Sequence, residues 1–235
     1  MSDFNPVNGL MWYIAFLFST TCHEAAHAWV ALKGGDPTAY EGGQVTLSPW
    51  PHMKREPIGM LVVPLVTALT RGWAIGWASV PFDPDWEERH PRRAALMAAA
   101  GPAANLLIAL TAFAGLKLGL ALGAFQAPAI AHFSSVVEAA RPGFTIDYLA
   151  HALSILLTLN VMLAVFNLLP LPPLDGAAVL GLLVSDRVAH RLVSFARAPG
   201  FSMVGLLVAW QVFPRFARPL FMAVLNLLHL GASYG

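Results

Sequence analysis

Long apolar segments separated by short polar ones run along this chain, and the pattern predicts helices that cross a membrane. Three of these segments approach or exceed the about 20 residues that a spanning helix needs: residues 7–32, 94–116 and 148–169. Two shorter apolar pieces near the end of the chain, 201–213 and 220–230, are separated by Pro214. They predict two thin spans or a helical hairpin.

The segments between these spans predict the remaining elements. Residues 58–69 are apolar but short for a span and contain Pro64, which predicts a re-entrant or short helix. Residues 44–47 fit a short strand, and the prolines that follow exclude a long one. Residues 177–198 begin apolar and become charged, which predicts an amphipathic helix on the cytoplasmic surface.

Together these elements predict an all-α polytopic membrane protein. We expect about five to six transmembrane helices, a re-entrant or short helix, and a short strand-like loop associated with the membrane. No internal repeat is visible, so we expect a single integral-membrane domain over residues 1–235, with a core at 7–183 and C-terminal helices at 184–235.

Composition indicates that a lipid bilayer surrounds the chain. Hydrophobic residues make up 57% of it, charged residues 11%, and the mean hydropathy is +0.62. A soluble domain has about 25% charged residues, so this chain lies outside that class. The net charge is +1 and no basic run is present, so we expect no nucleic-acid partner.

Basic residues predict which part of the chain faces the cytoplasm, because they concentrate on that side of membrane proteins. If residues 58–69 enter the membrane and return, all of the basic residues around them lie on one side, which favours re-entry over a full crossing. There are seven: Lys33, Lys54, Arg55, Arg71, Arg89, Arg92 and Arg93.

His23, Glu24 and His27 give the first candidate chemistry, and they lie in the second half of the first apolar segment. On a helix, residues four apart share a face, so both imidazoles can hold one Zn²⁺. Glu24 lies beside them, where a carboxylate can take a proton from a water that the metal activates. Ionisable residues in a membrane segment are costly and indicate function, and the alternative is a buried polar cluster between helices.

Asp175 is the candidate for the third ligand that a catalytic zinc site needs. Residues 170–176 are rich in proline and cannot stay helical, so the backbone opens at the end of a predicted span. Irregular backbone at membrane depth is tolerated where it is buried or lines a wet cavity, and there a carboxylate can reach a metal held by another helix. The alternative is an ordinary turn in which Asp175 caps the next helix.

Three further polar residues have more than one interpretation. Asn167 is a candidate hydrogen-bond donor to a developing oxyanion, and an interhelical hydrogen bond is its alternative. Asn105 has the same two interpretations, of which we favour the interhelical bond. His52 fits a histidine on a surface loop better than a second contact with the metal.

At these positions the chain resembles the site-2 proteases, the zinc-dependent intramembrane metalloproteases. Residues 23–27 are similar to the metal motif of this family, and residues 101–105 to the motif of its central helix. Residues 167–170 followed by 174–176 are similar to its second signature. Residues 35–39 and 46–52 are similar to a compact bacterial branch of the family without PDZ or CBS domains. We therefore expect a multi-pass protein of the bacterial cell (inner) membrane.

The resemblance implies a metalloendopeptidase with one Zn²⁺ per chain on His23, His27 and Asp175, with Glu24 and Asn167 as catalytic residues. Its substrate would be a single-span membrane protein, cut within or near its transmembrane segment, with residues 44–47 as the edge that holds the unwound substrate. Two alternatives come from other classes: a catalytically silent membrane scaffold or chaperone of the same fold, and a metal carrier. An intact Glu24 argues against the first.

Overall fold

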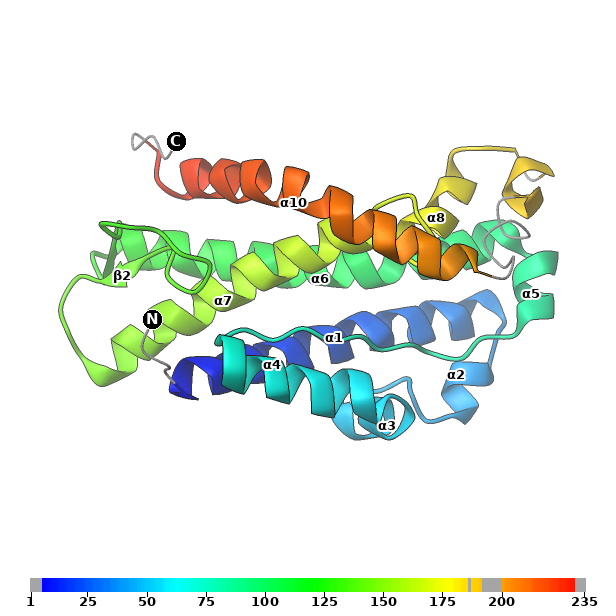
Figure 1. The fold of residues 1–235 in the computed structure, drawn as a ribbon, viewed down its shortest axis with the longest axis horizontal. Helices are drawn as coiled ribbons and strands as arrows, with labels where there is room; N and C mark the ends of the chain where they lie inside the picture. Colours follow the sequence, from blue (N-terminus) through cyan, green and yellow to red (C-terminus); the bar gives the residue numbers. More distant parts are fainter. Residues whose placement is uncertain (1–5, 186, 192–199, 231–235) are drawn as a thin grey trace.

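The computed structural model describes residues 6–185, 187–191 and 200–230, which form a bundle of long helices (Figure 1). Its centre consists of α1 (Pro6–Gly34), α6 (Pro91–Ala121) and α7 (Phe144–Asn167). α6 packs against both α1 and α7. The three long helices predicted from the apolar segments are therefore confirmed, and their bounds differ from the prediction by a few residues at each end.

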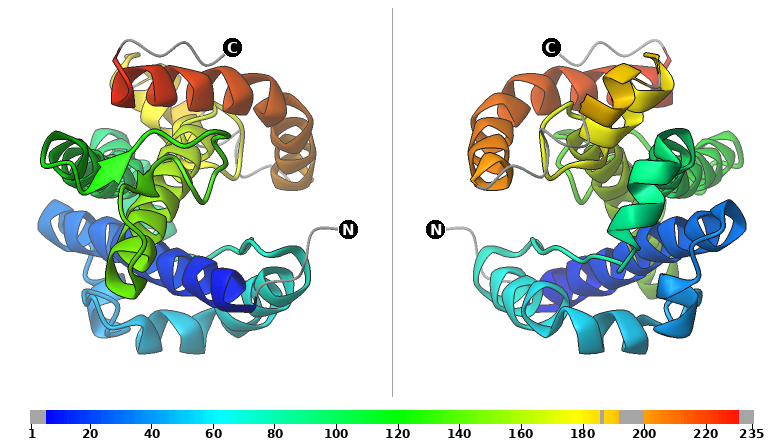
Figure 2. Two further views of the ribbon diagram at one scale, coloured as in Figure 1. Left: turned by 90° about the vertical axis from the view of Figure 1, so that its left-hand side faces the viewer. Right: turned by 90° about the vertical axis from the view of Figure 1, so that its right-hand side faces the viewer.

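Two of the described helices, α6 and α7, are long and apolar enough to cross a membrane. α1 has 29 residues and carries the histidines in its second half. α4 and α10 lie on opposite sides of the central helices (Figure 2). The chain is thus mostly helical, as predicted.

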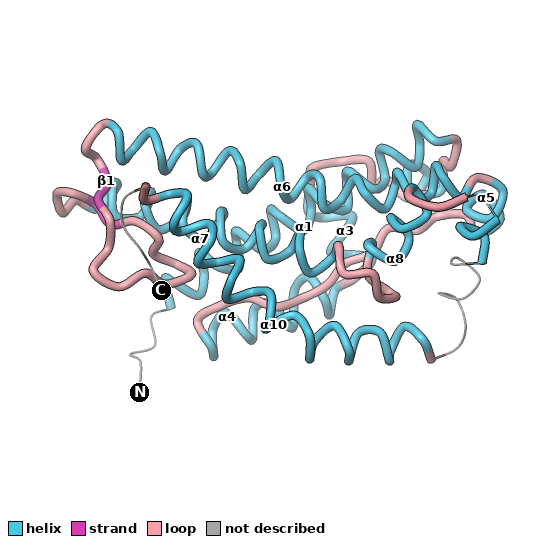
Figure 3. The backbone as a smooth tube through the Cα atoms, turned by 90° about the horizontal axis from the view of Figure 1, so that it is seen from above, coloured by secondary structure: helices cyan, strands magenta, loops and turns pink. Residues whose placement is uncertain are grey.

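After α1 the chain leads through short helices to α4, and an extended segment then runs back along α1. α2 (Thr38–Glu41) and α3 (Pro49–Arg55) lead to a π-helical turn (Ile58–Val62) and to α4 (Val63–Arg71), which packs against α1. Residues 73–83 then run in an extended conformation to α5 (Pro84–Arg89) (Figure 3). The short helix predicted at 58–69 is confirmed.

Hydrogen bonds fix both ends of the extended segment, residues 73–83, against α1. Asn8 Nδ2 donates to the carbonyl of Gly72 at 2.9 Å, and the backbone N–H of Asp83 donates to Asp36 Oδ2 at 2.9 Å. The chain therefore comes back to the end of α1 that carries Lys33. Arg71 precedes Gly72, which is bonded to Asn8 near the start of α1, whereas Lys33 lies at its other end, about 38 Å of helix away. The expectation that all seven basic residues lie on one side is therefore wrong for Arg71.

The strand predicted at 44–47 is wrong, because this stretch is a series of bends. Its backbone groups are used locally: the N–H of Gln44 donates to the carbonyl of Ala39, and the carbonyl of Thr46 accepts from His52. Pro49 then begins α3. The described chain has one strand pair instead, β1 (Phe125–Gln126) with β2 (Glu138–Ala139), in antiparallel register between α6 and α7.

The segment predicted as one amphipathic helix at 177–198 is interrupted. It contains α8 (Asp175–Val179), a 3₁₀ turn (Leu180–Leu182) and a helical stretch at 187–191, with non-helical residues at 183–185. Residue 186 and residues 192–199 of the predicted helix lie outside the described part of the chain.

The prediction of two C-terminal pieces is wrong, because 201–213 and all but the last two residues of 220–230 belong to one helix, α10 (Phe201–Leu228). Pro214 and Pro219 lie inside it, and the helix bends along its length (Figure 2). A proline removes one backbone hydrogen bond and kinks a helix, but flanking turns with apolar contacts can hold it together. Here Phe221, Leu225 and Leu228 are buried in the core that α6 and α7 share.

Candidate metal centre

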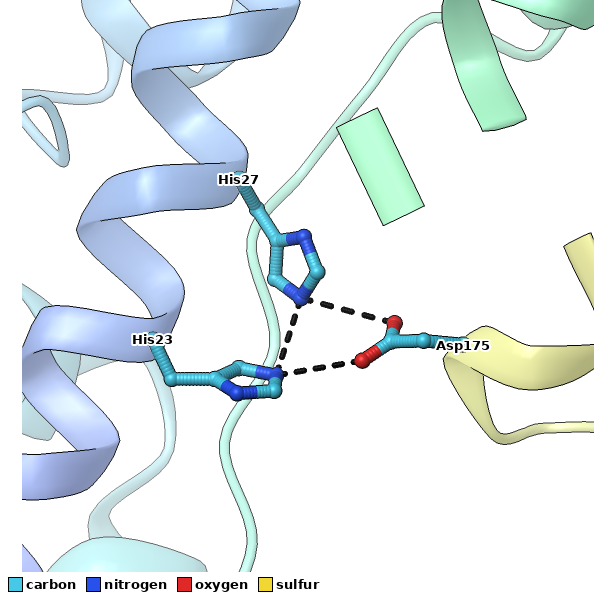
Figure 4. Close-up of side chains that lie close together, drawn as sticks. All are labelled: His23, His27 and Asp175. Atoms are coloured by element: carbon cyan, nitrogen blue, oxygen red, sulfur yellow. Dashed lines mark hydrogen bonds and ion pairs between the residues drawn. The ribbon is translucent and has the colours of Figure 1, made fainter. Parts of the chain in front are cut away.

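α1 places two imidazoles side by side in the interior of the bundle. His23 and His27 lie one turn apart on its buried face and are 7% and 6% exposed. Their Nε2 atoms are 2.9 Å apart, and the rings meet edge to face (Figure 4). The two histidines share one face of α1, as the helical spacing predicts, and this face packs against α6.

Asp175 reaches the same point from the other side. It is the first residue of α8, and its Oδ2 and Oδ1 lie 3.2 Å and 3.4 Å from Nε2 of His23 and His27 (Figure 4). Leu174 occupies the helix cap position without a side-chain cap bond, so Asp175 is not the capping residue of the alternative interpretation. Gly176 lets α8 start directly against the backbone of Leu168, because a β-carbon there would overlap that carbonyl.

Hydrogen bonds on the far side of each ring show which ring nitrogen is the donor. His23 Nδ1 is 2.6 Å from Oδ1 of Asn105, and His27 Nδ1 is 2.7 Å from the carbonyl oxygen of Met97. Both partners are acceptors, so Nδ1 is the donor in each ring, and a ring with one proton then presents the lone pair of Nε2. Three groups with lone pairs, two imidazoles and the carboxylate, therefore face one another.

This arrangement fits a bound cation. Lone pairs at these separations repel one another unless a positive charge lies among them, and Asp175 Oδ2 is buried without a hydrogen-bond partner. Among the described residues, these three form a group of side chains that could hold a metal ion, and their ligand atoms all lie within 4.8 Å of one another. Two imidazoles and one carboxylate, with a position left for water, are the donor set of a catalytic zinc site.

Gly101 on α6 closes one side of the cluster. A β-carbon at this position would overlap Nε2 of His27 and lie 2.5 Å from Nε2 of His23. The close approach of α6 to α1 therefore occurs at the metal cluster itself. A hydrogen at Gly101 leaves the space beside the two nitrogen atoms free.

Glu24 is buried beside the cluster, with 5% of its surface exposed. It lies next to His23 in the chain, and its carboxylate has no hydrogen-bond partner among the described residues. A buried carboxylate without a structural partner is suited to exchange a proton with a reacting molecule. This placement is compatible with the predicted role of Glu24 as a base, which stays a prediction.

Asn167 makes no hydrogen bond with the cluster among the described residues. It is the last residue of α7, and its Nδ2 donates to the carbonyl of Leu163 in its own helix at 3.0 Å. An oxyanion role for Asn167 therefore stays a prediction. His52 was expected on a loop surface, which is wrong: it is 1% exposed and its Nε2 lies 3.1 Å from the carbonyl oxygen of Thr46.

Asn105 and Asn160 are the residues that the sequence did not assign to the site. Asn105 was interpreted as an interhelical contact, and it does bond Asn160 on α7 at 2.9 Å, but it also holds His23. Both asparagines are 0% exposed. The available signal was a carboxamide inside each of two apolar spans, which needs a partner in the interior.

Comparisons with known proteins agree with this chemistry. A sequence model of Peptidase family M50 matches residues 11–211. "Putative zinc metalloprotease YwhC" of Bacillus subtilis is 34% identical over 189 residues, which cover 80% of this chain and 75% of that protein. "Putative zinc metalloprotease Rip2" of Mycolicibacterium smegmatis is 31% identical over 193 residues, 82% of this chain and 64% of that protein. No solved structure matches the chain.

Proposed function

The chain belongs to peptidase family M50, the site-2 proteases, and is a zinc-dependent metalloprotease; from this premise we propose that it is an intramembrane endopeptidase. Its substrate is a single-span membrane protein, which it cuts within or near the transmembrane segment. The observation that carries the proposal is the place of the metal cluster. His23 and His27 are buried against α6, a helix long and apolar enough to cross a membrane.

We propose a multi-pass arrangement in the inner membrane of a bacterium. The sequence favoured about five to six spans, but the two C-terminal pieces form one helix, which lowers the count. Four long helices, α1, α6, α7 and α10, then cross the bilayer, and residues 58–83 enter and return. The return is supported by the bond between Asp83 and Asp36 and by Arg93, which donates to the carbonyl of Gly34 at 3.1 Å.

Cysteine labelling tests this arrangement. In a Cys22→Ser background, Arg55→Cys and Arg89→Cys should both react with a membrane-impermeant thiol reagent from the cytoplasmic side. The two positions flank the helix and the extended segment, so re-entry places them on one side. Reaction from opposite sides of the membrane would instead make α4 a full span.

The extended segment is the proposed binding edge for substrate, in place of residues 44–47. Gly76 lies against the ring of Phe16 and Asp83 bonds to Asp36, so the segment passes the histidines of α1 between these two contacts. Among the described residues, no hydrogen bond is made by the backbone of residues 78–82. Unpaired backbone at membrane depth is tolerated where it lines a wet cavity or finds a partner.

A substrate strand can supply that partner. The carbonyl groups of a transmembrane helix are occupied by its own hydrogen bonds, so the helix must unwind before its peptide bond can be attacked. Pairing along an exposed edge replaces the hydrogen bonds that unwinding breaks. The proposed edge therefore holds the unwound segment beside the cluster.

The catalytic roles follow from the positions of the side chains. His23, His27 and Asp175 would hold the zinc ion, which supplies Lewis-acid activation of the attacking water and of the scissile carbonyl when it is bound. Glu24 takes a proton from the attacking water and gives it to the leaving amine, so that the products are a carboxylate and an amine. Asn167 has a second Nδ2 hydrogen, which is available for the developing oxyanion.

Glu24→Gln separates hydrolysis from metal binding. The amide has nearly the same shape but cannot act as a base, so we expect cleavage of a single-span reporter protein to fall by about 10²- to 10⁴-fold. Zinc content, measured on the same preparation, should equal that of the wild type. Glu41→Gln, at an exposed position of α2, is the matched control and should change neither quantity.

A comparable cleavage rate in Glu24→Gln would contradict the proposed mechanism. A wild type that binds zinc but cuts no single-span protein in a panel of reporters would contradict the intramembrane proposal, while the metal site would stand. The silent scaffold and the metal carrier would then be the better descriptions.

A further inference from the structure

A chain of buried side chains connects the metal cluster to the backbone of α7. Asn105 Oδ1 contacts His23 Nδ1, Asn105 Nδ2 donates to Asn160 Oδ1 at 2.9 Å, and Asn160 Nδ2 donates to the carbonyl oxygen of Leu156 at 2.8 Å. Asn160 Nδ2 also donates to Ser19 Oγ on α1 at 2.8 Å. Ser19, like both asparagines, is 0% exposed, so water does not take the place of any partner.

The direction of every hydrogen bond in this chain is determined at its far end. A backbone carbonyl only accepts, so Asn160 must turn Nδ2 toward Leu156 and Oδ1 toward Asn105. Asn105 must then turn Nδ2 toward Asn160 and Oδ1 toward His23. His23 Nδ1 consequently donates, and a ring with this one proton has its lone pair on Nε2, where the cluster is.

We propose that Asn160 is a positioning residue that, through Asn105, holds His23 in the tautomer that offers Nε2 to the metal. The inference rests on the proposed metal site and deepens it. A carboxamide has two ends of similar shape and opposite hydrogen-bonding character. If Asn105 turned over, its Nδ2 would donate to His23 Nδ1, the ring proton would move to Nε2, and His23 could no longer ligate the ion through that atom.

The second histidine shows why His23 needs such a chain. His27 Nδ1 donates directly to the carbonyl of Met97, an acceptor that cannot be reversed. Its tautomer is therefore fixed in one step. His23 has a reversible partner, so the orientation of that partner must itself be fixed, and Asn160 is the residue in contact with it. Loss of a residue that hydrogen-bonds the second nitrogen of a metal-bound histidine typically lowers metal affinity by about 10- to 100-fold.

The test compares four variants with two measurements that do not depend on cleavage. The first measurement is the tautomer of His23 in the zinc-free protein, from ¹⁵N chemical shifts of labelled histidine in detergent micelles. The second is the zinc dissociation constant from competition with a chelator. The variants are Asn160→Leu, Asn105→Leu, Ser19→Ala and Ser154→Ala.

Asn160→Leu should reduce the Nδ1–H tautomer of His23 and raise the zinc dissociation constant by about tenfold, and Asn105→Leu by at least as much. Ser19→Ala removes one partner of Asn160 but leaves the carbonyl of Leu156, so both quantities should stay at the wild-type values. Ser154→Ala removes a buried hydroxyl of α7 that bonds the N–H of Val136. It controls for a general loss of buried hydrogen bonds and should also leave both unchanged.

A double variant tests the order of the chain. Asn105→Asp has no N–H to place wrongly, since both of its oxygen atoms accept. Adding Asn160→Leu to Asn105→Asp should therefore leave the tautomer of His23 unchanged, although the same substitution alters it in the wild-type background. If Asn160→Leu does not fold, Asn160→Ala gives the same comparison with a smaller side chain.

The outcomes separate this inference from the function on which it rests. A wild type that binds zinc, with Asn160→Leu equal to it in both tautomer and affinity, overturns the positioning role and leaves the protease proposal intact. A folded wild type that does not bind zinc overturns the metal site itself, and with it both proposals.

Discussion

Within the described residues, two histidine–asparagine pairs connect α1 to other helices, and one of them belongs to the metal cluster. His23 of α1 lies 2.6 Å from Asn105 of α6, and His151 of α7 lies 2.6 Å from Asn8 of α1. Each chain of hydrogen bonds ends at a backbone carbonyl. In the second pair that carbonyl belongs to Gly72, where α4 turns into the extended segment.

The difference lies in what the other ring nitrogen faces. Nε2 of His23 faces His27 and Asp175, whose lone pairs need a cation among them. His151 belongs to no group of three metal-capable side chains in the described part of the chain. A histidine bonded to an asparagine between helices is therefore a structural link by default, and the convergence of lone pairs from two helices makes one of these pairs a candidate site.

The two pairs should differ most in zinc content when the histidine of each is replaced by alanine. His23→Ala removes a ligand, so zinc content should fall from about one per chain to nearly none, with loss of cleavage. His151→Ala should keep the zinc content of the wild type. Elemental analysis of the two purified variants makes the comparison, and loss of zinc from His151→Ala would show that the second pair also supports the metal.

Adding a methyl group at two glycines of α6 should give a second, smaller difference in zinc affinity. Gly101→Ala places a β-carbon against both Nε2 atoms, so the zinc dissociation constant should rise by at least about tenfold, as for loss of a partner behind the ligands. Gly115→Ala is the control on the same helix, because its β-carbon would meet Leu153 at 3.5 Å, an ordinary contact. Equal zinc affinities in the two variants would contradict the position assigned to Gly101.

Much of the candidate metal site could be predicted because it depends on local spacing. Two histidines four residues apart in an apolar segment share a face of any helix, and that face is the buried one in α1. Asp175 was predicted from the prolines that break the chain before it. An interhelical bond of Asn105 was predicted, but its partners Asn160 and His23 could not be, since they depend on how three helices are rotated against one another.

The errors in the fold also have physical causes. Residues 73–83 have neither a helical nor an alternating apolar period, so no pattern indicated that they would lie extended along α1. The strand signal at 44–47 was local propensity, which turns and a hydrogen bond from His52 override. Pro214 was interpreted as a break, but apolar packing of α10 against the core keeps the helix continuous.

Asn167 should show an intermediate effect confined to turnover. If its second Nδ2 hydrogen reaches the oxyanion, Asn167→Leu lowers kcat by about 10²-fold while zinc affinity stays at the wild-type value. Steady-state cleavage of a reporter, together with chelator competition, separates the two quantities. An unchanged kcat would assign Asn167 only its bond to the carbonyl of Leu163.

The smallest expected effect belongs to the second pair. Asn8→Leu removes the hydrogen bonds to Gly72 and His151, which are half-buried, and each such bond contributes about 0.5–1.5 kcal/mol to stability. The apparent unfolding temperature in detergent should therefore fall, while zinc affinity stays constant, because neither residue contacts the cluster. Asn105→Leu provides the contrast, since it removes hydrogen bonds of the same kind from a residue that holds a ligand. If Asn8→Leu weakened zinc binding as much as Asn105→Leu does, the two pairs would not be separable, and the cluster would depend on the packing of the whole bundle more than on the direction of the hydrogen bonds behind His23.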